Sequence, residues 1–117
     1  MSPSIPKHSK LITNIERDTD QRGQILSIVD HPVQNVALIE SSAGSIRSNH
    51  YHYKDFHFMY VLDGTIDYFF KPIDSDDITY FKVESGQTIF TPPMEVHSCH
   101  FPVSTLLIVS SGYPRDQ

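Results

Sequence analysis

The sequence predicts an all-β fold, a small sandwich or barrel built from short strands. Three observations support this prediction. Short runs rich in Tyr, Phe, Val, Ile and Thr recur along the 117 residues, and strands favour these residue types. Gly, Pro and Asp-Gly punctuate the runs, as turns require. No apolar period of 3.6 residues extends beyond about ten residues, so helices are not expected.

Nine strands are expected in order along the chain. They cover residues 24–29, 35–41, 45–52, 56–63, 65–71, 78–83, 87–91, 96–101 and 105–111. The Asp-Gly pair at 63–64 predicts a tight hairpin, because Asp-Gly accepts the positive φ of primed turns.

The chain length predicts a single domain over residues 1–117. The first ten residues are polar and contain Pro3 and Pro6. They are expected to form an N-terminal arm, either loose or ordered by a partner chain.

Composition excludes several classes of protein. Nine basic residues against 14 acidic ones give a net charge of −5, which argues against nucleic acid or an anionic membrane as the main partner. The N-terminus lacks the apolar segment of a secretory signal, and no apolar run reaches the roughly 18 residues of a membrane span. The single cysteine, Cys99, rules out an internal disulfide. Together these features favour the cytoplasm.

Histidines are concentrated in one segment, where His50, His52 and His57 fall within eight residues. Residues two apart on a strand share a face, so His50 and His52 should project together. A turn at 54–55 would place His57 on the antiparallel neighbour, on the same face. Three converging imidazoles would suit Zn, Fe, Ni or Cu and leave positions open for water or substrate. Taken singly, each histidine could equally be a solvated or hydrogen-bonded strand residue.

Two segments together resemble the motifs of the cupin superfamily. The first segment has the order Gly44, five residues, His50, one residue, His52, four residues, His57, six residues, Gly64, with His57 where glutamate is usual. The second segment has Gly86, five residues, Pro92 and then His97, with Met94 where glycine is usual and Phe101 where asparagine is usual.

The resemblance implies a cupin-type double-stranded β-helix, a jelly-roll barrel with its site inside. It also implies metal ligands at His50, His52, His57 and His97, and therefore a divalent transition metal as cofactor. An all-histidine set favours Zn, Fe, Ni or Cu over Mn or Mg. The alternative is a degenerate cupin whose histidines act as acid, base or packing residues.

Arg47 lies three residues before His50. This arrangement is similar to the Arg-x-x-His element of sugar-nucleotide cupins, such as dTDP-4-dehydrorhamnose 3,5-epimerases and related ketoisomerases. The resemblance implies that Arg47 binds an anionic substrate near a catalytic histidine. Strict alternation would turn Arg47 away from His50, so this role requires a β-bulge.

Other residues receive roles from their parity on the strands. Met59 shares a face with His57, and Cys99 shares a face with His97, so both are expected to shape the pocket and contact substrate. Phe56 and Phe58 should face the other way, in a contact between sheets or subunits. The remaining expectations are Glu95 and His100 at the surface or rim, Tyr68 and Tyr80 as strand residues or phenol donors, and His8 and His31 without a role.

Three functions follow from this site. The first is a metal-dependent enzyme of dioxygenase, isomerase or cyclase type that acts on a small polar molecule. The second is an epimerase or ketoisomerase of sugar nucleotides in polysaccharide synthesis, in which a histidine removes a proton beside a keto group and Arg47 holds the diphosphate. The third is a binding module without catalysis. In each case the ligand is a small molecule, and a homodimer is expected.

Overall fold

The computed structural model describes residues 5–114 and contains eleven strands and no helix in that range. The strands are β1 (Lys10–Ile12), β2 (Glu16–Asp20), β3 (Gly23–Ser27), β4 (Asn35–Ser41), β5 (Ile46–His50), β6 (His57–Asp63), β7 (Thr65–Pro72), β8 (Thr79–Glu84), β9 (Thr88–Thr91), β10 (Glu95–His100) and β11 (Thr105–Ser111). The all-β prediction is therefore confirmed. No helix in the described part is long and apolar enough to cross a membrane.

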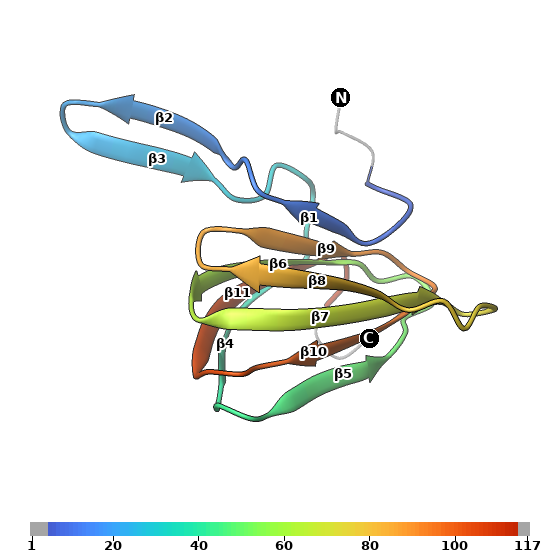
Figure 1. The fold of residues 1–117 in the computed structure, drawn as a ribbon. Coiled ribbons are helices and arrows are strands. Elements are labelled where there is room, and N and C mark those ends of the chain that lie inside the picture. The colour runs from blue at the N-terminus through green and yellow to red at the C-terminus, as the bar shows by residue number, and fades with distance from the viewer. Residues whose placement is uncertain (1–4, 115–117) are drawn as a thin grey trace.

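Two antiparallel sheets face each other and form the jelly roll (Figure 1). One has five strands in the order β1-β9-β6-β11-β4, and the other has four in the order β5-β10-β7-β8. Alternation along the strands places apolar residues between the sheets, as with Ile66 and Tyr68 of β7, which are fully buried. Burying each large apolar side chain in this layer contributes about 1.5–3 kcal/mol.

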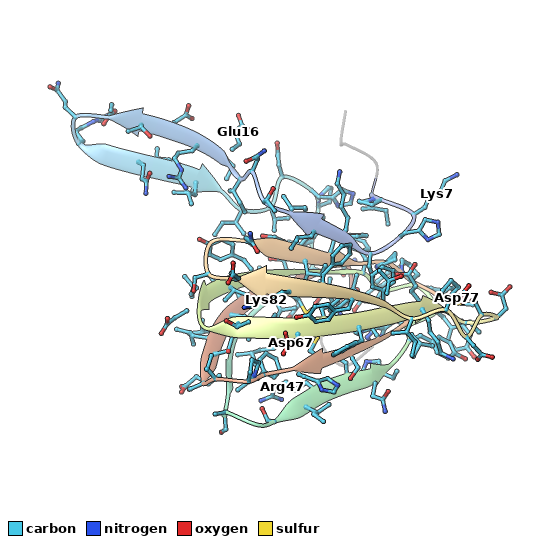
Figure 2. The ribbon with its side chains drawn as sticks, in the orientation of Figure 1. Lys7, Glu16, Arg47, Asp67, Asp77 and Lys82 are labelled. Carbon is cyan, nitrogen blue, oxygen red and sulfur yellow. The ribbon has the colours of Figure 1, made fainter. Side chains whose placement is uncertain are left out.

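Two strands were not predicted. All five residues of β2 are exposed and charged or hydroxylated, so the strand carries no apolar alternation to detect. It pairs only with β3, and the resulting hairpin projects away from the two large sheets (Figure 1). Glu16 marks the point where this hairpin leaves the body of the molecule (Figure 2). β1, the other missed strand, spans only three residues.

The predicted hairpin at Asp63-Gly64 is wrong. Strand β6 pairs with β9 and β11, whereas β7 pairs with β10 and β8, so the chain passes from one sheet to the other at Gly64. Gly64 has a φ of 111°, and a Cβ there would lie 2.8 Å from the carbonyl oxygen of Ser104. The glycine permits this close approach at the corner of the barrel, so its presence did not signal a primed turn.

Part of the predicted N-terminal arm packs on its own chain. Ser9 is buried, and the neighbouring strand β1 pairs with β9 from Lys10↔Phe90 to Ile12↔Thr88. Residues 1–4 of the arm, including Pro3, lie outside the described residues. The prediction of a single domain over residues 1–117 stays a prediction.

Candidate functional site

A cavity of about 320 Å³ opens between the two sheets. Its wall combines an apolar part with a cluster of titratable side chains. It is lined by Ile39, Arg47, Ser48, His50, His52, Asp55, His57, Met59, Cys99, Phe101, Leu107, Val109 and Ser111. The predicted pocket residues Arg47, Met59 and Cys99 therefore all reach this cavity, which has the size and mixed lining of a small-molecule site.

A β-bulge shapes the polar wall. Ser48 and Asn49 have φ values of 73° and 71°, and the register between β5 and β10 shifts so that His97 pairs with His50 while Ser98 pairs with Ser48. The bulge breaks strict alternation, and Arg47 and His50 consequently line the same cavity. Strand β5 ends at His50, so His52 lies in the following loop and not on the strand.

Three histidines cluster beside the bulge. Nε2 of His50 lies 3.1 Å from Nε2 of His52, so one ring donates a proton and the other accepts it. The His97 ring centroid lies 5.3 Å from that of His50 and 5.9 Å from that of His52. One ring nitrogen from each of the three histidines lies within 4.8 Å of the others.

His57 reaches the cavity from the opposite sheet. It begins β6, which pairs with β9 and β11, so the predicted pairing with the strand of His50 is wrong. The His57 and His52 ring centroids lie 4.9 Å apart across the cavity. Nε2 of His57 donates to Oδ2 of Asp55 at 3.1 Å, in a pair whose side chains are largely buried. Sequence reasoning treated Asp55 as a turn residue and missed this contact.

Burial lowers the pKa of two of the three clustered histidines, His52 and His97. Desolvation lowers the pKa of His97 to about 4, with smaller contributions from the neighbouring histidines. Desolvation also lowers the pKa of His52, and His57 and His50 add to that effect. A neutral imidazole can both accept and donate a proton, so His52 and His97 keep both capacities at neutral pH.

Arg47 is held at the cavity wall by two contacts. Its Nε donates to Oγ of Ser41 at 2.8 Å, and one terminal nitrogen donates to the carbonyl oxygen of Glu40 at 2.9 Å. Figure 2 shows Arg47 beside strands β5 and β10. These contacts orient the guanidinium and leave donors available for an anion.

The apolar wall contains both Met59 and Cys99, which are 5% and 2% exposed. Burial raises the pKa of the Cys99 thiol to about 12, so the group stays protonated and behaves as a small apolar residue. The predicted outward stripe is partly covered within the chain, since Phe56 and Phe58 contact His31 and Phe90.

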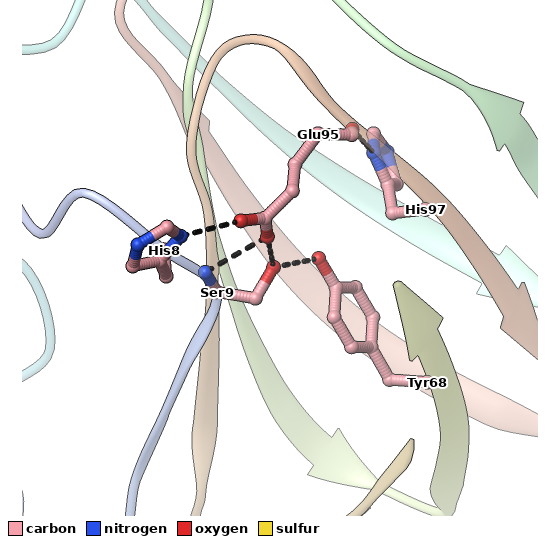
Figure 3. Close-up of polar contacts among 5 residues, drawn as sticks. All are labelled: His8, Ser9, Tyr68, Glu95 and His97. Carbon is pink, nitrogen blue, oxygen red and sulfur yellow. Dashed lines mark hydrogen bonds and ion pairs between the residues drawn. The ribbon is translucent and has the colours of Figure 1, made fainter. Parts of the chain in front are cut away.

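A second polar cluster was missed. Glu95, expected at the surface or rim, is 3% exposed and accepts hydrogen bonds from the backbone nitrogen and hydroxyl of Ser9 (Figure 3). His8, which received no predicted role, contacts the second oxygen of Glu95 at 3.1 Å. Nothing in the local sequence signals this cluster, because its partners are 86 residues apart in the chain.

The two facing sheets with the histidine-lined cavity between them form the cupin-type jelly-roll fold that the motifs predicted. The model of the family described as polysaccharide biosynthesis C-terminal domain matches residues 18–110. The chain belongs to this family. A comparison with curated proteins finds none that matches.

Solved structures share the fold at low sequence identity. The WlaRB TDP-quinovose 3,4-ketoisomerase of Campylobacter jejuni aligns with a TM-score of 0.79 at 15% identity, over 95% of this chain and 89% of that one. The QdtA 3,4-ketoisomerase of Thermoanaerobacterium thermosaccharolyticum, solved with TDP, gives 0.74 at 18%, over 97% and 87%. The dTDP-4-dehydrorhamnose 3,5-epimerase of Sulfolobus tokodaii gives 0.74 at 15%, over 97% and 74%.

The predicted divalent metal cofactor, Zn, Fe, Ni or Cu, is wrong. The similar structures are TDP-sugar ketoisomerases and epimerases, which act without a metal cofactor. The assignment of His50, His52, His57 and His97 as a ligand set stays a prediction. The ring nitrogens of His50, His52 and His97 converge, and His57 lies beside His52 and contacts Asp55. Convergent imidazoles misled the prediction because proton transfer and metal binding favour the same side chain.

Proposed function

We propose that this protein is an isomerase or epimerase that moves a proton next to the keto group of a nucleotide-linked sugar. One observation carries the proposal: the Asp55–His57 pair and the hydrogen-bonded His50–His52 pair face each other across a single cavity whose wall includes Arg47. Proton donors and acceptors thereby flank the space that a sugar ring would occupy.

The relatives support this choice of substrate. The family is described by polysaccharide biosynthesis, and the structural neighbours include two TDP-sugar 3,4-ketoisomerases and a 3,5-epimerase. One structure of QdtA contains TDP-4-keto-6-deoxyglucose. This compound is the natural first substrate to test.

His57 is the proposed base. Its ring takes the carbon-bound proton next to the ketone, and the electron pair of that C–H bond forms an enediolate with the carbonyl. Asp55 orients the ring through its bond to Nε2 and stabilises the imidazolium that forms. A positioned base of this kind contributes roughly 10²–10⁴-fold to the rate.

His50 and His52 are the proposed proton relay. They share a hydrogen bond, and burial lowers the pKa of His52, so one ring can donate to an oxygen of the enediolate while the other accepts. Delivery of a proton to the former carbonyl carbon moves the keto group to the neighbouring carbon, and delivery to the original carbon from the opposite face inverts the configuration of that carbon. Both outcomes balance without an external oxidant or reductant.

Arg47 is proposed to hold the diphosphate. A guanidinium forms charge-assisted bonds with phosphate oxygens, and the contacts of Arg47 with Ser41 and Glu40 reduce the entropy lost on binding. Met59 and Cys99, on the apolar wall, would contact the less polar face of the sugar.

Deuterium exchange tests the function. The protein is incubated with TDP-4-keto-6-deoxyglucose in D₂O and followed by NMR. The expected result is deuterium at a carbon next to the keto group, together with a product whose keto group or configuration has changed. The matched variants are His57→Gln, which should abolish exchange, and His100→Gln, which should not, because His100 is absent from the cavity lining.

The predicted alternative of a binding module without catalysis is an outcome of the same experiment. Calorimetric binding of the TDP-sugar, without exchange or product, would establish that module and contradict the proposed enzyme. The cytoplasmic location stays a prediction.

A homodimer also stays a proposal. The β2–β3 hairpin pairs with no other strand of the described chain, and Ile25 on it is 69% exposed. The edge strand β4 exposes Val36 and Leu38 at 62% and 66%. An isolated hairpin is marginally stable, so these apolar surfaces favour contact with a second copy. Light scattering should give twice the chain mass, and Leu38→Asp should shift it toward the monomer.

A further inference from the structure

The interior holds a buried carboxylate that the proposed reaction does not use. Glu95 opens β10, and its side chain is almost fully enclosed. Oε1 accepts from the backbone nitrogen of Ser9 at 3.0 Å and from its hydroxyl at 2.6 Å, and Oε2 lies 3.1 Å from Nδ1 of His8. Burying a carboxylate is costly unless both oxygens are paired, and both are paired by the N-terminal segment.

The backbone of the same residue, Glu95, contacts the ring of His97. The carbonyl oxygen of Glu95 lies 3.3 Å from Nδ1 of His97. A carbonyl only accepts, so Nδ1 carries the proton and Nε2 carries the lone pair. Nε2 is buried and has no hydrogen-bond partner among the described residues, and the ring lies beside His50. A buried nitrogen without a partner is unfavourable, so Nε2 would gain from accepting a hydrogen bond.

Tyr68 holds the same ring from its other side. The Tyr68 and His97 rings are nearly parallel, with an interplanar angle of 18° and centroids 6.2 Å apart. The Tyr68 hydroxyl lies 2.7 Å from the Ser9 hydroxyl and 2.7 Å from Oγ1 of Thr91. Figure 3 shows that Ser9 joins the two supports, because its hydroxyl contacts both Glu95 and Tyr68.

We propose that Ser9, Tyr68 and Glu95 are positioning residues that fix the orientation and tautomer of His97. The N-terminal segment thereby sets the site from outside the cavity, since neither Ser9 nor Glu95 lines it. His97 does not line the cavity itself, so it presents Nε2 as an acceptor for the neighbouring imidazole of His50, which does. The catalytic part of this inference rests on the proposed function, whereas the tautomer does not.

The direct test is ¹⁵N–¹H NMR of the histidine rings in the full chain without substrate. In the wild type, His97 should show a protonated Nδ1 and an unprotonated Nε2. Ser9→Ala and Tyr68→Phe should each mix the tautomers of His97 and broaden its signals. Ser9→Thr, which keeps the hydroxyl, should restore the wild-type spectrum.

Matched controls separate positioning from general destabilisation. Ser45→Ala removes a hydroxyl that donates to Ser42, and Tyr80→Phe removes a phenol that donates to Asp67, both on the exterior. Neither control should change the His97 signals. With a TDP-sugar substrate, Ser9→Ala and Tyr68→Phe should lower kcat/KM by about tenfold, while the controls should leave it unchanged.

Two results would overturn the proposal: an Nε2-protonated His97 in the wild type, or His97 signals in Ser9→Ala and Tyr68→Phe that match those of the controls. If one variant unfolds, the other still decides, because the two remove different atoms. Absence of turnover with every TDP-sugar would count against the proposed function but would leave the NMR result unaffected.

Discussion

Two groups of histidines, one on each side of the cavity, place one residue type in two environments. On the four-stranded side, His50, His52 and His97 contact one another, and burial lowers the pKa of both His52 and His97. On the five-stranded side, His57 is engaged with the carboxylate of Asp55. The first environment disfavours the charged form of His52 and His97, whereas the second pairs His57 with a carboxylate. The comparison teaches that partners, not the number of histidines, assign the chemistry.

The largest expected effect comes from removing His57, the histidine that is paired with Asp55. His57→Gln should reduce kcat for a TDP-sugar substrate by on the order of 10³-fold, because the proposed base is lost. Asp55→Asn should give a smaller loss, since the ring remains but its imidazolium is no longer stabilised. Steady-state kinetics check both variants. A loss in Asp55→Asn that exceeded the loss in His57→Gln would contradict the assignment.

The buried histidine His97 should make the free energy of unfolding depend on pH. The pKa of His97 is about 4 in the folded chain against 6.5 for a free ring, so unfolding takes up a proton between these pH values. The free energy of unfolding should therefore fall as the pH drops from about 6.5 to about 4, by up to about 3 kcal/mol. Urea unfolding at several pH values measures this fall. His97→Gln should flatten the curve, and His100→Gln should leave it steep.

Variants of Arg47 separate substrate binding, measured by KM, from the chemical step, measured by kcat. Arg47→Ala should raise KM by roughly ten- to a hundredfold, with a smaller effect on kcat, because a charge-assisted bond to the diphosphate contributes about 1.5–3 kcal/mol. Arg47→Lys should recover only part of the loss, since an ammonium lacks the planar fork of donors. Equal losses in kcat and kcat/KM would instead assign Arg47 to the chemical step.

The smallest expected effect on stability is at Met94, in the turn that contacts the backbone of His52. Met94 has a φ of 63°, and its backbone nitrogen donates to the carbonyl oxygen of His52 at 2.7 Å. Non-glycine residues adopt this conformation at a cost, so Met94→Gly should raise the free energy of unfolding by about 0.5–1 kcal/mol. Thermal unfolding measures it. A destabilised variant would show that the Met94 side chain contributes more than its backbone strain costs.

Much of the fold followed from the sequence, because alternation of residue types records the faces of strands. The predicted strands at 35–41 and 105–111 agree with β4 and β11 at both ends. The exposed strand β2 carries no such record. The predicted turn at Asp63-Gly64 failed because a glycine reports local conformation and not which sheet the next strand joins.

The site was predicted as a set of residues but not as an arrangement. Spacing identified the cavity residues Arg47, His50, His52 and His57. It placed His57 on the wrong sheet and missed its partner Asp55, because strand pairing depends on distant contacts. Burial of Glu95 was invisible for the same reason, since Ser9 approaches it only in the folded chain. The metal prediction failed because convergent imidazoles alone do not distinguish a ligand from a base.

The central claim is that the cavity histidines transfer protons and do not hold a metal. The most direct measurement compares kcat/KM for TDP-4-keto-6-deoxyglucose in untreated protein and in protein dialysed against a chelator, with metal content measured in both. The account predicts equal values in the two samples. Activity that disappears on chelation and returns when one equivalent of a transition metal is added would contradict it.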